Sequence, residues 1–371
     1  MSFTPYALTP YALRSHALRL TPYASGGCTM KAMILEGICD LKSEKEPLRL
    51  VDMPVPSCAP GEVRIKISAC GVCHTELDEI EGRTPPPRFP VIPGHQVIGF
   101  VEALGKGSSR FRTGDRVGVT WLNSACGTCR FCREGNENLC DRFTATGRDV
   151  DGGYAEYMTV PESYAFPVPD LFSDVEAAPL LCAGTIGYRS LRLAGIKNGD
   201  NIGLIGFGAS AHLVIQMARH MYPSSKIFVF ARSAGERDFA RELGAFWAGD
   251  TADTSPEKID RAIDTTPVWG TIVHALRNIE KGGRLVINAI RKEEADKKEL
   301  LGLSYPEHLW LEKEIKTVAN VASRDVRDFL ELASRIGIHP EVELFSLEEA
   351  NTALMELKER KIRGAKVIKI A

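Results

Sequence analysis

Short apolar runs alternate with helical segments between residues 184 and 320, and this alternation constrains the fold more than any other feature of the chain. Repeated strand–helix units predict βαβ crossovers and a parallel, doubly wound sheet covered by helices. We therefore predict a separate α/β domain over residues 184–320. The predicted strands begin with 201–206 and 226–230, the helices with 209–221 and 235–243, and segments 262–265, 269–280, 284–289 and 314–320 continue the series.

The chain on either side of this region has a different texture. Residues 30–183 contain short β runs broken by Gly and Pro, for example at 63–68, 97–104, 116–120 and 154–160. Residues 321–371 contain two helix-like segments and a final strand at 365–370, which we expect to pack back on the first domain. The sequence thus predicts a β-rich domain built from residues 30–183 and 321–371.

Residues 1–29 precede the first predicted strand, which we place at Met30. They repeat the phrase Thr-Pro-Tyr-Ala, and the first acidic residue of the chain is Glu36. This composition predicts a disordered, low-complexity extension. Its basic residues leave a transit peptide open as an alternative.

Charge and composition exclude several classes of partner. The 371 residues carry a net charge of −2, which gives no electrostatic reason to bind nucleic acid or an anionic membrane. No apolar run approaches the roughly 20 residues that span a bilayer. The 10 cysteines are too few for a disulfide scaffold and are clustered, which indicates metal binding in a reducing, cytoplasmic compartment.

A glycine-rich turn, GFGASA, follows the first predicted strand of the α/β region and opens a helix. Gly206 suits the tight turn, Gly208 lets the backbone approach a pyrophosphate, and Ala211 is small enough for close helix–strand packing. Ser210 lies inside the same turn. Because the turn sits in a βαβ unit, we predict a dinucleotide-binding Rossmann domain.

The end of the second predicted strand bears on the choice of dinucleotide. An NAD site usually has an acidic residue there, but this chain has Ala231 followed by Arg232 and Ser233. A guanidinium forks onto phosphate oxygens, so Arg232 and Ser233 are predicted to bind a 2′-phosphate. NADP(H) is therefore favoured over NAD(H), and a solvated surface role for Arg232 is the alternative.

Four cysteines fall within a 15-residue stretch, CGTCRFCREGNENLC, which begins at Cys126 and ends at Cys140. An iron–sulfur run has a shorter last gap followed by Pro, whereas Asp141 follows here. Four thiolates without an open position are typical of a structural zinc site. We predict that Cys126, Cys129, Cys132 and Cys140 bind such a zinc.

Three separated segments each contain one further candidate metal ligand: Cys73, His95 and Cys182. Taken singly, a lone cysteine is usually a small buried hydrophobe. Cys70 and Cys73 also form a C-x-x-C pair with possible redox chemistry.

Seven motifs follow one another in a characteristic order between about Met30 and the C-terminus. They are CGVCHTE, PGHQVIGFVEALG, GDRVGV, CGTCRFCREGNENLC, DGGYAEY, LLCAG and GFGASA. In this the chain resembles the zinc-dependent medium-chain alcohol dehydrogenases, in their bacterial branch of cinnamyl-alcohol-dehydrogenase-like enzymes. The resemblance implies a GroES-like β-rich catalytic domain beside the Rossmann domain. It also implies two zinc ions per chain, an alcohol or aldehyde substrate and a homodimer or homotetramer.

The resemblance also assigns roles to residues. It implies that Cys73, His95 and Cys182 hold the catalytic zinc, and that Thr75 passes the proton. It places His74 and Arg363 at the pyrophosphate of the cofactor. Trp121 falls where a bulky residue walls the substrate pocket, with core packing as the alternative.

Three positions depart from the family pattern. Gln96 replaces the usual acidic residue after the ligand histidine, and Glu76 replaces an aspartate. Asp78 replaces the histidine that often ends the proton relay, and a carboxylate is a poor proton acceptor at neutral pH. Either Asp78 has a shifted pKa or protons leave through water.

Fold and family do not fix the substrate. The leading interpretation is an alcohol dehydrogenase or aldehyde reductase. A polyol or amino-alcohol dehydrogenase, a catalytically silent cofactor-binding protein and an iron–sulfur carrier are the alternatives.

Overall fold

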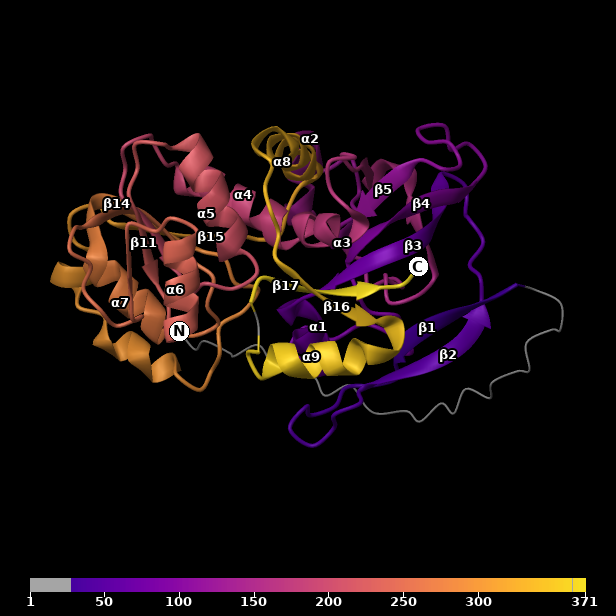
Figure 1. Cartoon of the computed structure of the whole chain (residues 1–371), viewed down its shortest axis with the longest axis horizontal. Coiled ribbons are helices and arrows are strands. Elements are labelled where there is room, and N and C mark those ends of the chain that lie inside the picture. The colour runs from indigo at the N-terminus through magenta and orange to yellow at the C-terminus, as the bar shows by residue number, and fades with distance from the viewer. Residues whose placement is uncertain (1–27, 362) are drawn as a thin grey trace, which may run out of the picture.

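The structure is a computed structural model that describes residues 28–361 and 363–371. The predicted extension therefore lies almost wholly outside the described residues. Figure 1 shows two lobes side by side, one built on β3, β4 and β5 and the other on β11, β14 and β15. Within the described part of the chain, no helix has both the length and the apolar character needed to cross a membrane.

The β-rich domain is organised around a seven-stranded sheet in the order β16-β17-β3-β4-β5-β9, with β8 also paired to β3. The central strand β3 is buried over its last six residues, as expected for a strand covered on both faces. A hairpin of β1 and β2 and a small pair of β6 and β7 complete the domain. The strands are β1 Thr29–Leu35, β2 Leu48–Pro54, β3 Glu62–Val72, β4 Gln96–Leu104, β5 Arg116–Val119, β6 Leu122–Ser124, β7 Thr144–Ala145, β8 Tyr157–Pro161, β9 Ala165–Pro167, β16 Val342–Ser346 and β17 Ala365–Lys369.

The Rossmann domain has a six-stranded sheet in the order β12-β11-β10-β13-β14-β15, and every pairing in it is parallel. This confirms the parallel, doubly wound sheet predicted from the alternating pattern. The chain builds outward from β10 to β12, then returns to β13 and builds the other way to β15. The strands are β10 Ile202–Ile205, β11 Ile227–Phe230, β12 Trp247–Gly249, β13 Ile259–Asp264, β14 Ile279–Ile287 and β15 Glu314–Thr317.

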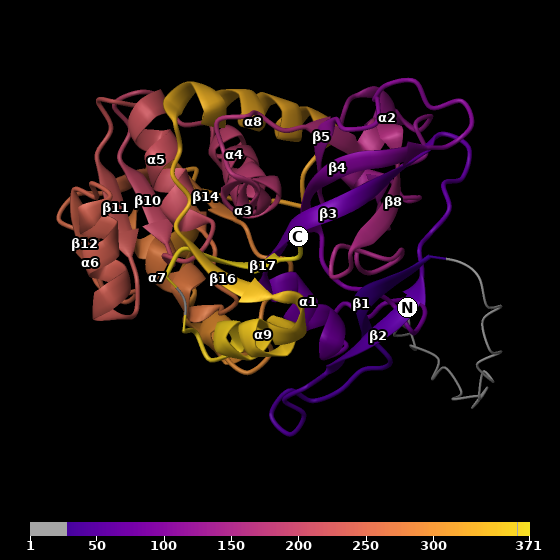
Figure 2. The same cartoon turned by 45° about the vertical axis from the view of Figure 1, so that its right-hand side comes forward.

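Nine α-helices are assigned among the described residues. The longer ones cover the Rossmann sheet or join the two domains, and the short ones follow strands of the β-rich domain (Figures 1 and 2). They are α1 His74–Ile80, α2 Arg130–Arg133, α3 Asp174–Ala177, α4 Ala183–Ala194, α5 Ala211–Met221, α6 Ala234–Glu242, α7 Gly270–Asn278, α8 Ser323–Ile336 and α9 Ala350–Lys358.

The C-terminal segment after β15 contacts both domains. Helix α8 packs across α4, as Figure 2 shows, and a Cβ on Gly184 would lie 2.5 Å from the ring of Phe329. The glycine therefore permits this close helix approach. Further along, β17 pairs antiparallel with β3 and β16 pairs with β17, so the segment returns to the seven-stranded sheet of the β-rich domain. The domain limits at residues 183/184 and 320/321 stay predictions.

Candidate active site and cofactor crevice

Three separated segments bring Cys73, His95 and Cys182 together. Cys73 follows β3 and caps the N-terminus of α1, while His95 directly precedes β4. Because β3 and β4 are antiparallel neighbours with Gly71 opposite Gln96, these two ligands emerge side by side. Cys182 is the N-cap residue of α4, although its side chain makes no capping hydrogen bond, and it lies where the chain enters the Rossmann domain. The three ligand atoms all lie within 4.8 Å of one another.

The spacing of these atoms fits a zinc ion. The Sγ of Cys73 lies 3.6 Å from Nε2 of His95. Zinc–sulfur and zinc–nitrogen bonds of about 2.3 and 2.0 Å at a tetrahedral angle place such atoms about 3.6 Å apart. Two thiols and an imidazole are also the donor set that zinc prefers over harder cations.

Glu76 contacts the proposed histidine ligand on the side of its ring opposite to Cys73. Its Oε1 lies 2.6 Å from Nδ1 of His95, and both side chains are almost completely buried. Its Oε2 accepts a hydrogen bond from the backbone N–H of Cys73 at 2.9 Å. A carboxylate behind the ligating imidazole fixes the ring orientation, so this glutamate performs the orienting task from a position where the family has an aspartate.

Thr75 lies beside the cysteine ligand. Its backbone N–H donates to Sγ of Cys73 at 3.4 Å, and the Cys73 thiol donates to its Oγ1 at 3.3 Å. The threonine hydroxyl is thus next to the predicted metal position. It can both accept and donate a proton there.

The electrostatics of the cluster are those of a potential cation site. The close approach of Cys182 and burial raise the pKa of the Cys73 thiol well above its ordinary value. Burial lowers the pKa of His95, but the nearby Glu76 carboxylate and Cys73 outweigh it and raise that pKa well above its ordinary value. Two thiolates and a neutral imidazole therefore need a bound cation to be stable here.

The four-cysteine lobe forms a second cluster, whose sulfur atoms lie within 4.8 Å of one another. Sγ of Cys132 lies 3.8 Å from that of Cys126 and 3.5 Å from that of Cys129. Backbone N–H groups of Thr128 and Cys129 donate to Cys126 and lower its pKa to about 5, whereas burial and Cys129 raise the pKa of Cys132 to about 12. Tetrahedral zinc bound by four thiolates requires sulfur atoms about 3.8 Å apart, so this cluster also fits the ion.

The glycine-rich turn occupies the switch point of the Rossmann sheet, between β10 and β13. Gly206 has φ +83°, and a Cβ there would lie 2.8 Å from Oγ1 of Thr265, so the position requires glycine. A Cβ on Gly208 would meet nothing within 4 Å. Open α/β sheets bind ligands in the crevice outside this point. Ala211 is buried, and the Ser210 hydroxyl donates to the carbonyl of Ala183 at 2.8 Å, which ties this turn to the segment of Cys182.

Arg232 and Ser233 lie at the end of β11, as predicted. Arg232 is exposed, and among the described residues its guanidinium has no hydrogen-bond or ion-pair partner. Ser233 caps α6, since its hydroxyl accepts from the backbone N–H of Glu236 at 3.1 Å. The structure thus leaves Arg232 available to a ligand and shows a structural task for Ser233.

His74 and Arg363 are placed differently with respect to the crevice. His74 is the first residue of α1 and is exposed. Arg363 binds Glu341 at 2.8 Å and Glu242 at 2.7 Å, and its Cζ lies 4.2 Å from the ring centroid of Phe239. Phe239 in turn packs edge-on against Phe207 of the glycine-rich turn, so Arg363 lies near the predicted pyrophosphate position. Contact of either residue with a cofactor stays a prediction.

Two of the residues that depart from the family pattern, Gln96 and Asp78, are buried and make defined contacts. Gln96 is buried, and its amide fills the space beside Gly71, where a Cβ would lie 2.8 Å from Cδ of Gln96. Asp78 is also buried and binds the guanidinium groups of Arg83 and Arg291. It is thus part of an ion-pair network.

Sequence reasoning missed Glu79, which is 2% exposed. Nε1 of Trp121 donates to its Oε1 at 3.4 Å, and burial followed by the charge of Glu76 raises the pKa of Glu79 well above its ordinary value. Trp121 itself is half-buried and packs against Phe143, with 5.0 Å between ring centroids. A glutamate at this helical position gives no sequence signal, because its burial arises from the docking of α1 against the loop of Trp121.

Comparison with known proteins identifies related enzymes. The sequence model of the family described as Alcohol dehydrogenase GroES-like domain matches residues 59–170. Probable alcohol dehydrogenase AdhA of Mycobacterium tuberculosis is 41% identical over 329 residues, which cover 87% of this chain and 93% of that protein. An alcohol dehydrogenase of Geobacillus stearothermophilus is 32% identical over 335 residues, with 88% and 96% covered.

Solved structures with the same fold include a cinnamyl alcohol dehydrogenase from Sorghum bicolor. It superposes with a TM-score of 0.79 at 25% identity, over 92% of this chain and 98% of that one. A protein described as CAD from Helicobacter pylori, solved in complex with NADP(H), has a TM-score of 0.80 at 23% identity and the same coverage. The second similarity shows the fold alone.

Proposed function

Because the chain belongs to the zinc-dependent medium-chain alcohol dehydrogenase family, we propose that it transfers hydride between a primary alcohol, or the corresponding aldehyde, and a nicotinamide cofactor. The family and fold class predicted from the motifs are confirmed, and the chain is an oxidoreductase of the alcohol dehydrogenase type. The proposal extends to the zinc ligands, the cofactor preference and the substrate class.

The observation that carries the proposal is the convergence of Cys73, His95 and Cys182 within 4.8 Å. Three protein ligands are the number that catalytic zinc sites supply, with the fourth position left for water or substrate. When bound there, zinc would act as a Lewis acid on the oxygen of an alcohol or aldehyde. Glu76 is directed to His95 and the Cys73 N–H, so it supports the ligands instead of adding a fourth.

The chain's own residues supply the rest of the chemistry. Thr75 holds its hydroxyl beside Cys73 Sγ, where it could accept the proton of a substrate alcohol while it donates its own proton to solvent water, with the reverse transfer in aldehyde reduction. The hydride acceptor would occupy the crevice at Gly206 and Gly208, with its pyrophosphate at the N-terminus of α5. His74 and Arg363 are proposed to contact the same pyrophosphate.

We propose NADP(H) as the preferred cofactor. Ala231 is buried where an NAD site has a carboxylate, and the neighbouring Arg232 guanidinium is exposed. A free guanidinium at the end of β11 favours a 2′-phosphate over a bare ribose. The H. pylori neighbour, which shares this fold, was solved with NADP(H).

The four-cysteine lobe is proposed to bind the second, structural zinc through Cys126, Cys129, Cys132 and Cys140. Its fit rests on the sulfur spacings of 3.5 and 3.8 Å described above. A closed set of four thiolates leaves no position for substrate. The lobe contacts the segment between the domains, since Nδ2 of Asn138 donates to the carbonyl of Ala319 at 2.5 Å.

Glu79 supports a second candidate, a polyol or amino-alcohol dehydrogenase. Its buried carboxyl group lies beside Trp121, the residue predicted to wall the substrate pocket. A polar group in this position would favour a substrate with an additional hydroxyl or ammonium group, because a buried carboxyl needs a partner.

The assembly is proposed to be a homodimer or homotetramer. Strand β15 is an edge strand, all four of its residues are exposed, and Ile315 is 44% exposed. An exposed edge strand with an apolar side chain favours pairing with another copy. A cytoplasmic location is proposed because all 10 cysteines lie in the described part of the chain as free thiols.

The decisive test of function compares Cys182→Ser with wild type and with Cys58→Ser, a control cysteine outside both clusters. We expect Cys182→Ser to lose one zinc per chain and aldehyde reduction, while Cys58→Ser keeps both. Metal analysis and NADPH absorbance with a panel of aldehydes, polyols and amino alcohols provide the measurements. If Cys182→Ser kept full activity with one zinc fewer, the catalytic assignment would be wrong.

A further inference from the structure

Asp78 connects the two domains, although the family resemblance places a proton-relay group at this position. Its Oδ1 lies 2.6 Å from Nε of Arg83, in its own domain, and 2.8 Å from Nε of Arg291, in the Rossmann domain. The aspartate side chain is 6% exposed. One buried carboxylate oxygen therefore binds two guanidinium groups from opposite sides of the domain boundary.

The end of this network in the β-rich domain is fixed to helix α1. The carbonyl of Asp78 accepts hydrogen bonds from the backbone N–H groups of Arg83 at 2.8 Å and Thr84 at 3.1 Å. Arg83 also pairs with Glu81, which pairs with Lys358 of α9. Asp78 is thus held on the helix whose first turn carries Thr75 and Glu76.

The end in the Rossmann domain is fixed just as firmly. Arg291 is followed by Lys292, whose side chain is 7% exposed and pairs with the buried Asp264. Nζ of Lys292 also donates to the carbonyls of Thr266 at 2.7 Å and Val268 at 3.1 Å. The loop that carries Arg291 therefore cannot shift without breaking a buried ion pair, which is costly.

This anchor adjoins the dinucleotide turn. Thr265, next to Asp264, donates through its backbone N–H and its hydroxyl to the carbonyl of Ile205, at 2.9 and 3.1 Å. Ile205 is the last residue of β10 and directly precedes Gly206. A continuous series of contacts thus runs from the turn at Gly206 through Lys292 and Arg291 to Asp78.

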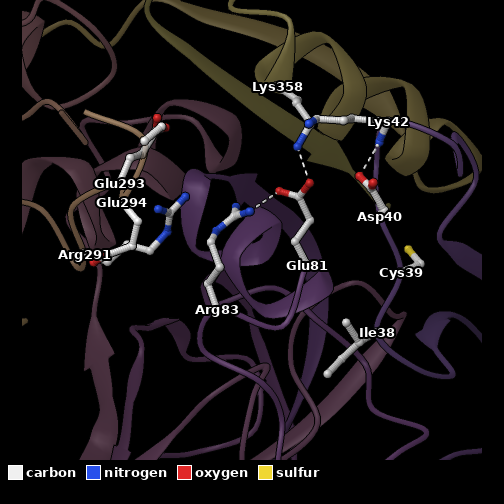
Figure 3. A pocket seen from close by; sticks show the side chains of 11 residues that line it. Ile38, Cys39, Asp40, Lys42, Glu81, Arg83, Arg291, Glu293, Glu294 and Lys358 are labelled. Atoms are coloured by element: carbon white, nitrogen blue, oxygen red, sulfur yellow. Dashed lines mark hydrogen bonds and ion pairs between the residues drawn. The ribbon is translucent and has the colours of Figure 1, made fainter. Parts of the chain in front are cut away.

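The network borders a cavity of about 560 Å³ lined by both domains. Figure 3 shows the guanidinium groups of Arg83 and Arg291 turned toward each other, with Glu81 bound between Arg83 and Lys358. Glu293, from the same loop as Arg291, also lines the cavity and has no ion-pair partner among the described residues. It provides a matched charge for a control variant.

We propose that Asp78 and Arg291 form an interdomain strut that holds the zinc-ligand helix α1 in register with the cofactor crevice, and that Asp78 is a positioning residue and not a proton acceptor. The proposal rests on the proposed function for the identity of the cofactor and the metal. A proton on Asp78 would weaken two ion pairs at a buried site, so proton transfer through it would loosen the domain contact each time. On this proposal Thr75 passes its proton to solvent water and not to Asp78.

The test is a double-mutant cycle of Asp78→Asn, Arg291→Gln and the double variant. NADPH binding is measured by fluorescence, independently of turnover, together with zinc content and thermal midpoint. The pH profile of kcat/KM is measured with an aldehyde that the wild-type enzyme reduces. Arg291→Lys keeps the positive charge but lacks the planar guanidinium group. Glu293→Gln removes a charge from the same loop at a residue that is not part of the Asp78–Arg291 contact.

We expect each single variant to weaken NADPH binding within the roughly 5- to 150-fold range of a site–site coupling. The double variant should bind NADPH no more weakly than either single variant, because both substitutions remove the same contact. Arg291→Lys should recover part of the affinity, and Glu293→Gln should bind NADPH like wild type. The pH profile of Asp78→Asn should keep the shape of the wild-type profile.

Two outcomes would overturn the strut. One is a loss of NADPH affinity in the double variant equal to the sum of the losses in the single variants. The other is an unchanged NADPH affinity with a shifted pH profile in Asp78→Asn. If Asp78→Asn fails to fold, the comparison of Arg291→Gln, Arg291→Lys and Glu293→Gln decides the question. If the wild-type protein binds NADPH but reduces no aldehyde, the proposed function fails while the binding cycle still tests the strut.

Discussion

The carboxylate of Glu76 lies 2.6 Å from Nδ1 of His95, so that the Nε2 face of the ring is directed at Cys73. This contact and the hydrogen bond from the Cys73 N–H occupy both oxygens of one buried glutamate. Two proposed metal ligands that are 22 residues apart in the chain are therefore oriented by the same side chain.

Glu76→Gln tests this orientation. The amide retains the shape but loses the charge behind the imidazole, and the loss of such a partner typically costs about 10- to 100-fold in metal affinity or activity. We expect catalytic zinc to be removed by a weaker chelator, while the zinc of the four-cysteine lobe stays bound. Metal analysis after stepwise chelation measures both, and equal retention of the two ions would contradict the role of Glu76.

The pH dependence of zinc binding follows from the raised pKa values of Cys73 and His95. Zinc requires the thiolate and the neutral imidazole, so binding releases protons and affinity should rise with pH. In the metal-free protein, the raised pKa of His95 gives stability that is complete below its unfolded value of 6.5 and is lost as the pH rises through the folded value.

The difference in thermal midpoint between zinc-loaded and zinc-free protein should therefore widen from pH 6 to pH 8. Taking this difference cancels groups remote from the site, such as His212, whose pKa burial lowers to about 4. A difference that stays constant over this interval would show that His95 and Cys73 are not the ligands.

Arg232→Ala tests the cofactor preference. A hydrogen bond to a charged group contributes about 1.5–3 kcal/mol, so loss of the guanidinium should raise the KM for NADPH about tenfold or more and leave that for NADH unchanged. Ser233→Ala tests the second predicted phosphate contact. It removes the cap of α6, which should cost about 1 kcal/mol of unfolding free energy with a smaller effect on selectivity. An NADH preference in the wild-type enzyme would refute the role of Arg232.

Cys129→Ser tests the separation of the two clusters. The lobe contains only the short helix α2, which has no buried residue, and a 3-10 turn at Glu137–Leu139. Its stability should therefore depend on the metal, and we expect loss of one zinc and a lower thermal midpoint. Limited proteolysis should cut the lobe. Without the metal, the hydrogen bond from the Arg324 side chain of α8 to Oδ1 of Asn136 is not enough to keep the lobe folded. Catalytic zinc should remain, and a variant that keeps two zinc ions per chain would disprove the four-thiolate assignment.

Much of this architecture was predictable from local sequence. The strand predicted at 226–230 is β11 Ile227–Phe230 and the helix at 235–243 is α6 Ala234–Glu242, because periodicity and a Ser-x-x-Glu capping box define them. The three residues of β12 Trp247–Gly249 gave too short a signal. Strand β16 Val342–Ser346 has an exposed, mixed pattern and is a strand because β17 pairs with it.

The candidate site also has parts that local sequence predicts and parts that it does not. Each metal ligand stands in a recognisable local motif, so the candidates could be named before their distances were known. The Asp78–Arg291 pair joins residues 213 positions apart and depends on how two domains dock, which no local pattern encodes. Helix α1 begins at an unusual cap, Cys73, and the usual Ser/Thr capping signature does not include cysteine.

The pairing of β17 with β3 has a consequence for synthesis. Lys366 lies opposite Val72, the last residue before Cys73, so the strand that leads to the proposed metal site is bordered by a segment that is synthesised after the whole Rossmann domain. A nascent chain can complete the Rossmann domain while β3 still lacks this neighbour. The sheet beside Cys73 can therefore be completed only after residues 365–369 have been synthesised.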